Sequence, residues 1–131
     1  MARAVPHARL TGVEVSAQAI EGAREAATAA GIDNADFLTG DATAWAAAEA
    51  DGPEGPPDAV VVNPPRRGLG GELAGWLERC GVRDVIYSSC NPTTLAADLE
   101  AMPSLRVVAG RYVDMFPHTA HAEVIVSLRR G

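Results

Sequence analysis

The sequence predicts an α/β protein in which a mostly parallel sheet carries helices on both faces and closes with antiparallel strands. Short apolar runs alternate along the chain with Ala-rich or amphipathic stretches that begin at capping residues. The last two apolar runs, residues 105–113 and 123–128, have nothing helical between them, which indicates an antiparallel pair. With 131 residues and 47% apolar side chains, the chain is long enough for one domain with a core.

The first part of the chain contains two predicted strand–helix units. Residues 10–15 form a short strand with an acidic residue at its end, and Ser16 caps a helix over residues 17–30 that Gly31 ends. Residues 35–41 form a second strand that also ends in an acid, and a short Ala-rich helix follows over residues 43–50. The Gly- and Pro-rich segment that comes next, residues 51–57, is a surface loop.

The middle of the chain begins with a β-branched run, residues 59–62. This run lacks polar alternation, which is expected of a strand buried on both faces. It ends at Asn63, because the two prolines that follow cannot continue a hydrogen-bonded ladder. Residues 70–80 form an amphipathic helix whose inward side chains are Leu73, Trp76 and Leu77.

A cysteine lies at the centre of the next strand–helix unit. Residues 84–87 predict a buried strand, and a helix through residue 101 begins with Asn91 as N-cap and Pro92 as first helical residue. The thiol of Cys90 therefore lies just outside a helix N-terminus, where free backbone N–H groups and the macrodipole favour the nucleophilic thiolate. An inert buried cysteine at a strand end is an equally good interpretation of this placement.

Four polar side chains fall at or just past the carboxyl ends of the predicted strands: Glu14, Asp41, Asn63 and Cys90. Ligands of α/β sheets bind outside these strand ends, so the four residues predict one shared site. Glu14 is placed to accept hydrogen bonds from ribose hydroxyls, or else it is an exposed acid. Asp41 either accepts from an adenine amino group or caps the following helix.

Two further segments carry candidate groups. The prolines after Asn63 fix the backbone so that its amide and a neighbouring carbonyl point to one spot, although a plain turn is the alternative. Arg66 and Arg67 are either solvated or bind an anion. Glu123, at the start of the last strand, is a candidate general base or an edge-strand glutamate in water. His118 and His121 lack a suitable third ligand, which makes a metal site the poorer interpretation.

Composition limits the possible partners. A formal net charge of −6, with no lysine among the eleven basic residues, argues against this chain binding nucleic acid tightly by itself. No apolar run reaches membrane-spanning length, and no secretory segment follows Met1. The two cysteines do not form a C-x-x-C pair, which suits a reducing cytoplasm better than an oxidising compartment.

Three stretches of the chain together resemble the RNA uracil-5-methyltransferases that use S-adenosylmethionine, and above all the branch that acts on 23S ribosomal RNA. These stretches are Asn-Pro-Pro-Arg-Arg-Gly at 63–68, Tyr-Ser-Ser-Cys-Asn at 87–91 and Asp-Met-Phe-Pro-His-Thr-Ala-His-Ala-Glu at 114–123. Thr-Gly-Val-Glu-Val-Ser at 11–16 is similar to the family's acidic ribose-binding strand end. The resemblance covers nearly the whole chain in order.

The resemblance implies a role for most of the candidate residues. Cys90 is the expected nucleophile and Glu123 the base that removes a proton from carbon 5 of uracil. Glu14 and Asn63 are expected to contact the methyl donor, S-adenosylmethionine, with Asp41 as a further candidate. A separate hypothesis, which rests on guanidinium chemistry, is that Arg66 or Arg67 orients RNA phosphate or the uracil carbonyl.

The resemblance also implies what this chain lacks. Members of the family are several times longer at the amino end, where many carry an RNA-binding barrel and several carry cysteines for an iron–sulfur cluster. The expected fold is a Rossmann-like class I methyltransferase sheet without its first strand and glycine-rich loop. We therefore expect a carboxyl-terminal catalytic portion over residues 1–131 that is inactive alone, binds ribosomal RNA weakly and is cytoplasmic. The alternative is a non-catalytic module that forms homodimers through exposed strand edges.

Overall fold

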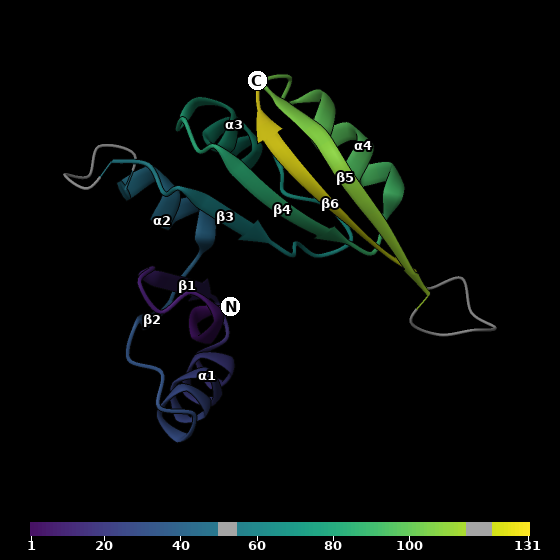
Figure 1. Cartoon of the computed structure of the whole chain (residues 1–131). Coiled ribbons are helices and arrows are strands. Elements are labelled where there is room, and N and C mark those ends of the chain that lie inside the picture. The colour runs from purple at the N-terminus through teal and green to yellow at the C-terminus, as the bar shows by residue number, and fades with distance from the viewer. Residues whose placement is uncertain (50–54, 115–121) are drawn as a thin grey trace. The chain divides into compact units, whose positions relative to one another are not determined.

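The computed structural model describes residues 1–49, 55–114 and 122–131, which form two compact units, Met1–Ala48 and Glu49–Gly131. Strands and helices alternate along the chain, which confirms the α/β class, and each unit has its own sheet (Figure 1). The elements are η1 (Ala2–Ala4), β1 (Leu10–Glu14), α1 (Ala17–Ala29), β2 (Ala35–Thr39), α2 (Ala42–Glu49), β3 (Ala59–Val62), α3 (Gly71–Arg79), β4 (Asp84–Ser89), α4 (Pro92–Glu100), β5 (Leu105–Asp114) and β6 (Ala122–Arg130).

The first unit is a parallel strand pair with the helix α1 between its strands in sequence. The strands β1 and β2 are paired from Leu10 opposite Ala35 to Glu14 opposite Thr39. The hydroxyl of Ser16 accepts a hydrogen bond from the N–H of Ala19 at 3.2 Å, which confirms Ser16 as the N-cap of α1. The strand β1 ends at Glu14 and β2 ends at Thr39, two residues before Asp41, so both predicted acids lie at or just past a strand end.

The second unit contains a mixed sheet with the strand order β3-β4-β6-β5 (Figure 1). The strands β3 and β4 are parallel, and β6 is antiparallel to both of its neighbours. The predicted antiparallel pairing of the last two strands, β5 and β6, is therefore confirmed. The described strands form two sheets, however, where the sequence predicted a single one.

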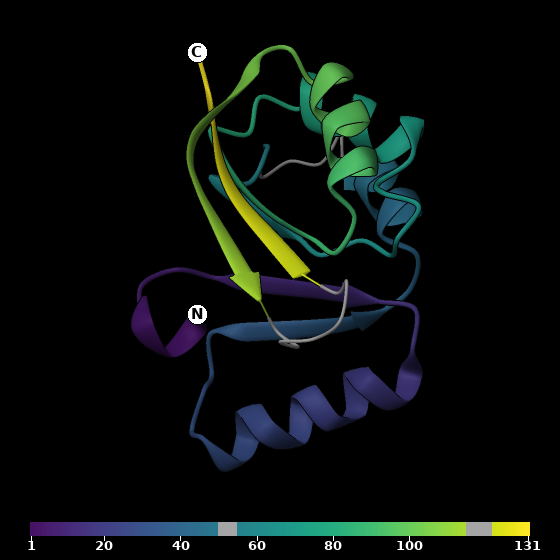
Figure 2. The same ribbon diagram turned by 90° about the vertical axis from the view of Figure 1, so that its right-hand side faces the viewer.

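The helices α3 and α4 lie on the same face of the second sheet (Figure 2). On β4 the side chains that face these helices, Val85, Tyr87 and Ser89, are buried, whereas Ile86 on the opposite face is 42% exposed. Leu77 of α3 is fully buried, as the amphipathic pattern predicts, and Leu95 of α4 is nearly so. The core of this unit therefore lies between one face of the sheet and the two helices.

The expectation that residues 59–62 are buried on both faces is wrong. Val61 is 49% exposed and is paired with Ile86, which is also exposed, on the face that α3 and α4 do not cover. The strand β3 is also an edge strand of its sheet. An unbroken apolar run shows that a segment prefers extended structure, but its burial depends on the layers that surround it.

Candidate active site

Cys90 lies in the short connection between β4 and α4, at the carboxyl end of β4. The connection is held by Ser89, whose buried hydroxyl accepts from the N–H of Asn91 at 3.1 Å and donates to its carbonyl at 3.0 Å. The side chain of Cys90 is exposed and its thiol is free, so the alternative of a buried cysteine is wrong, while the reactivity of the thiol stays a prediction.

The helix α4 begins as the sequence predicts. The side-chain carbonyl of Asn91 accepts a hydrogen bond from the N–H of Thr93 at 3.1 Å, and Pro92 is the first helical residue. Cys90 therefore comes directly before Asn91, the N-cap of the nine-residue helix α4. Backbone dipoles at such an end stabilise negative charge nearby.

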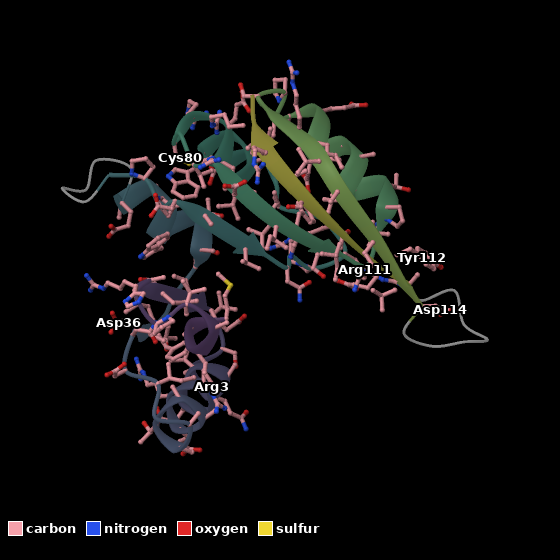
Figure 3. All side chains as sticks on the ribbon, in the orientation of Figure 1. Arg3, Asp36, Cys80, Arg111, Tyr112 and Asp114 are labelled. Atoms are coloured by element: carbon pink, nitrogen blue, oxygen red, sulfur yellow. The ribbon has the colours of Figure 1, made fainter. Side chains whose placement is uncertain are left out.

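The two cysteines lie at opposite ends of β4. Cys80 caps the C-terminus of α3, where Figure 3 labels it, and its thiol donates to the carbonyl of Leu77 at 3.6 Å. The six-residue strand between the two cysteines spans roughly 20 Å. A disulfide needs Cα atoms less than about 7 Å apart, so the two thiols stay free in this fold.

The loop that follows Asn63 is bound to the first turn of α4. The backbone carbonyl of Arg66 accepts hydrogen bonds from the amide of Asn91 and from the hydroxyl of Thr94, both at 3.1 Å. Because β3 and β4 are parallel neighbours, Asn63 also emerges at the same end of the sheet as Cys90. The second unit thus brings together Asn63, Arg66 and the turn that carries Cys90.

Asp98 of α4 forms a hydrogen bond at the other end of the same loop, at Leu69. Its carboxylate oxygen Oδ2 accepts from the hydroxyl of Tyr87 at 2.6 Å and from the N–H of Leu69 at 2.9 Å. Burial of the phenol raises the pKa of Tyr87 above its ordinary value, and the hydrogen bond to Asp98 with the charges of Asp98 and Cys90 adds to this rise. One carboxylate therefore joins β4, α4 and the arginine-bearing loop.

Gly68 allows this close approach of the loop to Asp98. It adopts a φ of +84°, and a Cβ on it would lie 2.6 Å from Oδ2 of Asp98. The N–H of Gly68 also donates to the carbonyl of Pro65 at 2.9 Å and closes a turn around the two arginines. The side chains of Arg66 and Arg67 are exposed.

Glu123 lies on β6 at the same end of the sheet as Cys90. In the antiparallel register Ser89 is opposite Val124, so the residue after Ser89 and the residue before Val124 are at one end of the strand pair. The half-buried carboxylate of Glu123 accepts a hydrogen bond from the hydroxyl of Ser88 at 2.6 Å through its oxygen Oε1. The backbone register thus places Cys90 and Glu123 at one end of this strand pair, and their service to one substrate stays a prediction.

The first unit carries the other two candidate residues at the carboxyl ends of its strands. Glu14 is exposed, its oxygen Oε1 accepts from the N–H of Ser16 at 3.0 Å, and its carbonyl accepts from Gly40 at 3.0 Å. Asp41 accepts from the N–H of Ala44 at 2.9 Å and so caps α2. Its contact with an adenine stays a prediction, as does the meeting of these two acids with the residues of the second unit.

Sequence reasoning missed Ser88, Tyr87 and Asp98. A signal for Asp98 was present, because it lies three residues after the buried Leu95, on the side of the helix that faces the protein. A carboxylate on such a side needs hydrogen-bond donors. Ser88 gave no comparable signal, since a serine in a strand is ordinary.

Two expectations fall wholly or partly outside the described residues. His118 and His121, the candidate metal ligands, lie within residues 115–121 and so outside the described residues. Within the described ranges, no group of three or more His, Cys, Asp or Glu side chains is arranged to hold a metal ion. The described helices are also too short and too polar for any of them to cross a membrane.

The chain is similar to known proteins over nearly its whole length. A family model described as tRNA (Uracil-5-)-methyltransferase matches residues 56–131. The 23S rRNA (uracil(747)-C(5))-methyltransferase of Serratia proteamaculans is 44% identical over 128 residues, which are 98% of this chain and 33% of that protein. The Salmonella typhimurium enzyme of the same description is 42% identical over 98% of this chain and 33% of its own length. The chain thus spans about a third of these relatives.

Solved structures agree with these matches. The tRNA (uracil-54, C5)-methyltransferase of Pyrococcus abyssi, in complex with S-adenosyl-L-homocysteine, superimposes with a TM-score of 0.77. It is 32% identical, and the match covers 92% of this chain and 28% of that one. TrmN from Thermus thermophilus gives a TM-score of 0.70 at 20% identity over 99% of this chain and 39% of its own, and this likeness concerns the fold alone.

Proposed function

Because this chain belongs to the tRNA (Uracil-5-)-methyltransferase family, we propose that it supplies the catalytic part of an S-adenosylmethionine-dependent enzyme that forms 5-methyluridine in 23S ribosomal RNA. The exposed thiol of Cys90 at the amino end of α4, on the same sheet end as Glu123, is the observation that carries this proposal. The 23S enzymes are 42–44% identical to the chain and the tRNA enzyme 32%, which favours ribosomal RNA as substrate.

Cys90 is the proposed nucleophile. Carbon 5 of uracil is too poor a nucleophile to take a methyl group directly, so the thiolate first adds to carbon 6. The new sulfur–carbon bond moves the electron pair of the ring double bond to carbon 5, which becomes enolate-like and attacks the methyl group. The exposure of Cys90 supports this role, because the thiol must reach a base that has left its stack.

Glu123 is the proposed general base for the second half of the reaction. After methyl transfer, carbon 5 carries both a methyl group and a hydrogen. A carboxylate that takes this proton leaves an electron pair that restores the ring double bond as the bond from sulfur to carbon 6 breaks. Half-burial of Glu123, together with its place at the same sheet end as Cys90, supports this division of labour.

The methyl donor is S-adenosylmethionine, whose sulfonium supplies an activated methyl group when it is bound. Glu14 fits a contact with its ribose, because the exposed carboxylate uses Oε1 for Ser16 and no donor among the described residues occupies Oε2, which can accept from a hydroxyl. Asn63 is exposed at a strand end and fits a contact with the donor as well. Asp41 has its oxygen Oδ1 engaged in capping, and within the described part of the chain no donor occupies Oδ2, which fits a contact with an adenine amino group.

Arg66 and Arg67 are proposed to contact the RNA. Hydrogen bonds connect their loop to α4 and its N-cap at two points, through the carbonyl of Arg66 and through the N–H of Leu69. These bonds hold the backbone of both arginines near the turn that carries Cys90. Guanidinium groups suit phosphate or a uracil carbonyl. With a net charge of −6, we expect this chain alone to bind ribosomal RNA weakly and the rest of a longer enzyme to add affinity. We expect such an enzyme in the cytoplasm.

A second candidate function is that of a non-catalytic module that associates with itself. The edge strand β3 favours it, since its outer edge is paired with no other described strand and, with the exposed Val61, is able to pair with another chain. Titration calorimetry of the 131-residue chain with S-adenosylmethionine, together with sedimentation, separates the two. Donor binding by a monomer supports the catalytic proposal, and a stable dimer without donor binding supports the module.

The chemistry is tested by trapping with RNA that contains 5-fluorouridine. The protein for this test is a fusion in which the chain replaces the matching third of the Serratia proteamaculans enzyme. Fluorine at carbon 5 cannot leave as a proton, so a covalent complex with RNA should accumulate and survive denaturation. Cys90→Ala should abolish the complex and Cys80→Ala, the matched control, should not.

Two results would overturn the proposal. One is a fusion that traps no RNA although it folds and binds the donor. The other is retained methyl transfer in the Cys90→Ala variant, which would point instead to methylation of an exocyclic nitrogen, since that chemistry needs no thiol.

A further inference from the structure

We infer that Ser88 is a positioning residue for Glu123, which it holds by a hydrogen bond so that one carboxylate oxygen stays available for the proton of carbon 5. This inference rests on the function proposed above, and it assigns a role to Ser88, to which neither the sequence analysis nor that mechanism gives one. The distance from the hydroxyl of Ser88 to Oε1 of Glu123 is 2.6 Å. Such a length is typical of a strong, charge-assisted bond between a hydroxyl and a carboxylate.

The backbone explains why the two side chains meet. Ser88 is paired with Ile125, and Glu123 lies two residues from Ile125 on the same strand, so Ser88 and Glu123 are diagonal neighbours on one face of the sheet. This is the face that α3 and α4 leave open, as the exposure of Ile86 shows. The alternation of side chains along β4 sets Ser88 on this open face, between two buried residues.

The hydrogen bond has a direct chemical consequence. A carboxylate has no proton to donate, so the hydroxyl of Ser88 must donate to Oε1 and thereby restrict the rotation of a long, flexible side chain. None of the residues that the structure describes donates to Oε2 of Glu123, so this oxygen is the one left to receive the proton. When that proton arrives on Oε2, the bond from Ser88 to Oε1 remains, so the side chain keeps its orientation throughout the step.

The proposal predicts a defect in one step only. Addition of Cys90 to carbon 6 and transfer of the methyl group come before proton removal, so neither needs Glu123. Loss of the Ser88 hydroxyl should therefore leave both early steps unchanged and slow the release of the methylated RNA. A merely structural role for Ser88 would lower stability and reduce all steps together.

The test uses the fusion protein described above with two variants of nearly equal shape. Ser88→Thr keeps the hydroxyl and Ser88→Val removes it, and both side chains are well suited to a strand. Ser127→Val is the matched control, because Ser127 lies on the neighbouring strand opposite Ile86 and on the same face. Single-turnover reactions with uridine RNA follow methyl transfer and the covalent protein–RNA complex separately, and thermal melts check that each variant folds.

We expect Ser88→Val to accumulate the methylated covalent complex and to show kcat lower by roughly tenfold to a hundredfold, with KM for RNA unchanged. It should still trap 5-fluorouridine RNA like the parent, while Ser88→Thr and Ser127→Val should turn over normally. Equal turnover by Ser88→Val and Ser88→Thr would overturn the role of Ser88 and leave the proposed function standing. Failure of the parent fusion to trap RNA would overturn the proposed function, and the role of Ser88 with it.

Discussion

Replacing Tyr87 with phenylalanine removes a single hydroxyl from the second unit and leaves the buried ring in place. That hydroxyl donates to Asp98 at 2.6 Å, and Asp98 in turn holds Leu69 in the loop that carries the arginines. A hydrogen bond to a charged group contributes about 1.5–3 kcal/mol. Because Asp98 keeps its bond from Leu69, we expect a loss of about 2 kcal/mol in the free energy of unfolding, or roughly 6–10 °C in Tm.

The same substitution should change how stability depends on pH. In the unfolded chain Tyr87 loses its proton near pH 10, whereas the fold raises its pKa, so the folded state holds the proton more tightly. The stabilisation by Tyr87 is therefore complete below about pH 10 and is lost as the pH rises above that value. The phenylalanine variant has no proton to lose at this position, so its deficit relative to the parent should shrink at high pH.

Urea unfolding at pH 8 and pH 11 measures both effects. Tyr112→Phe is the control, because Tyr112 is 68% exposed on β5, where Figure 3 labels it. The control should match the parent at both pH values. A Tyr87→Phe protein as stable as the parent at pH 8, or a deficit of equal size at pH 8 and pH 11, would refute the argument.

Three further substitutions or measurements follow from the contacts around Cys90. Gly68→Ala should lower the free energy of unfolding by about 1–3 kcal/mol, since its φ is +84° and a Cβ would collide with Asp98; equal chemical stability would contradict this. Asn91→Ala should cost about 1–2 kcal/mol in the same assay through loss of the helix cap, while Asn91→Ser should recover most of it. Iodoacetamide should label the exposed Cys90 before the half-buried Cys80, as peptide mass spectrometry would show. The reverse order would contradict the exposure of Cys90.

Local chemistry explains why much of the fold was predictable. Ser16 and Asn91 cap helices because a short polar side chain followed by helix-forming residues can satisfy free N–H groups within three residues. The same logic predicted the end of β3 at Asn63, where prolines follow, and the position of Cys90 between β4 and α4. Each of these features depends on neighbours in sequence, so the residues themselves are sufficient to predict it.

Burial and partnership were decided by the tertiary structure. Val61 belongs to an unbroken apolar run, yet it is half exposed because β3 is an edge strand and the helices cover only the other face. The bond from Ser88 to Glu123 joins residues 35 positions apart and exists only in one register of β4 and β6. A shift of one residue would turn each side chain to the opposite face.

The sequence by itself determined which residues are candidates for the chemistry: Glu14, Asn63 and Cys90 by their type and their place at strand ends, and Glu123 through the family resemblance. Only the tertiary structure decided what holds them, namely Ser88 on the carboxylate and Asp98 on the loop and strand. The physical reason is the distance along the chain between the groups that interact. Reactivity and capping depend on groups within a few residues, whereas hydrogen bonds between strands and helices depend on sheet register and on which face the helices cover.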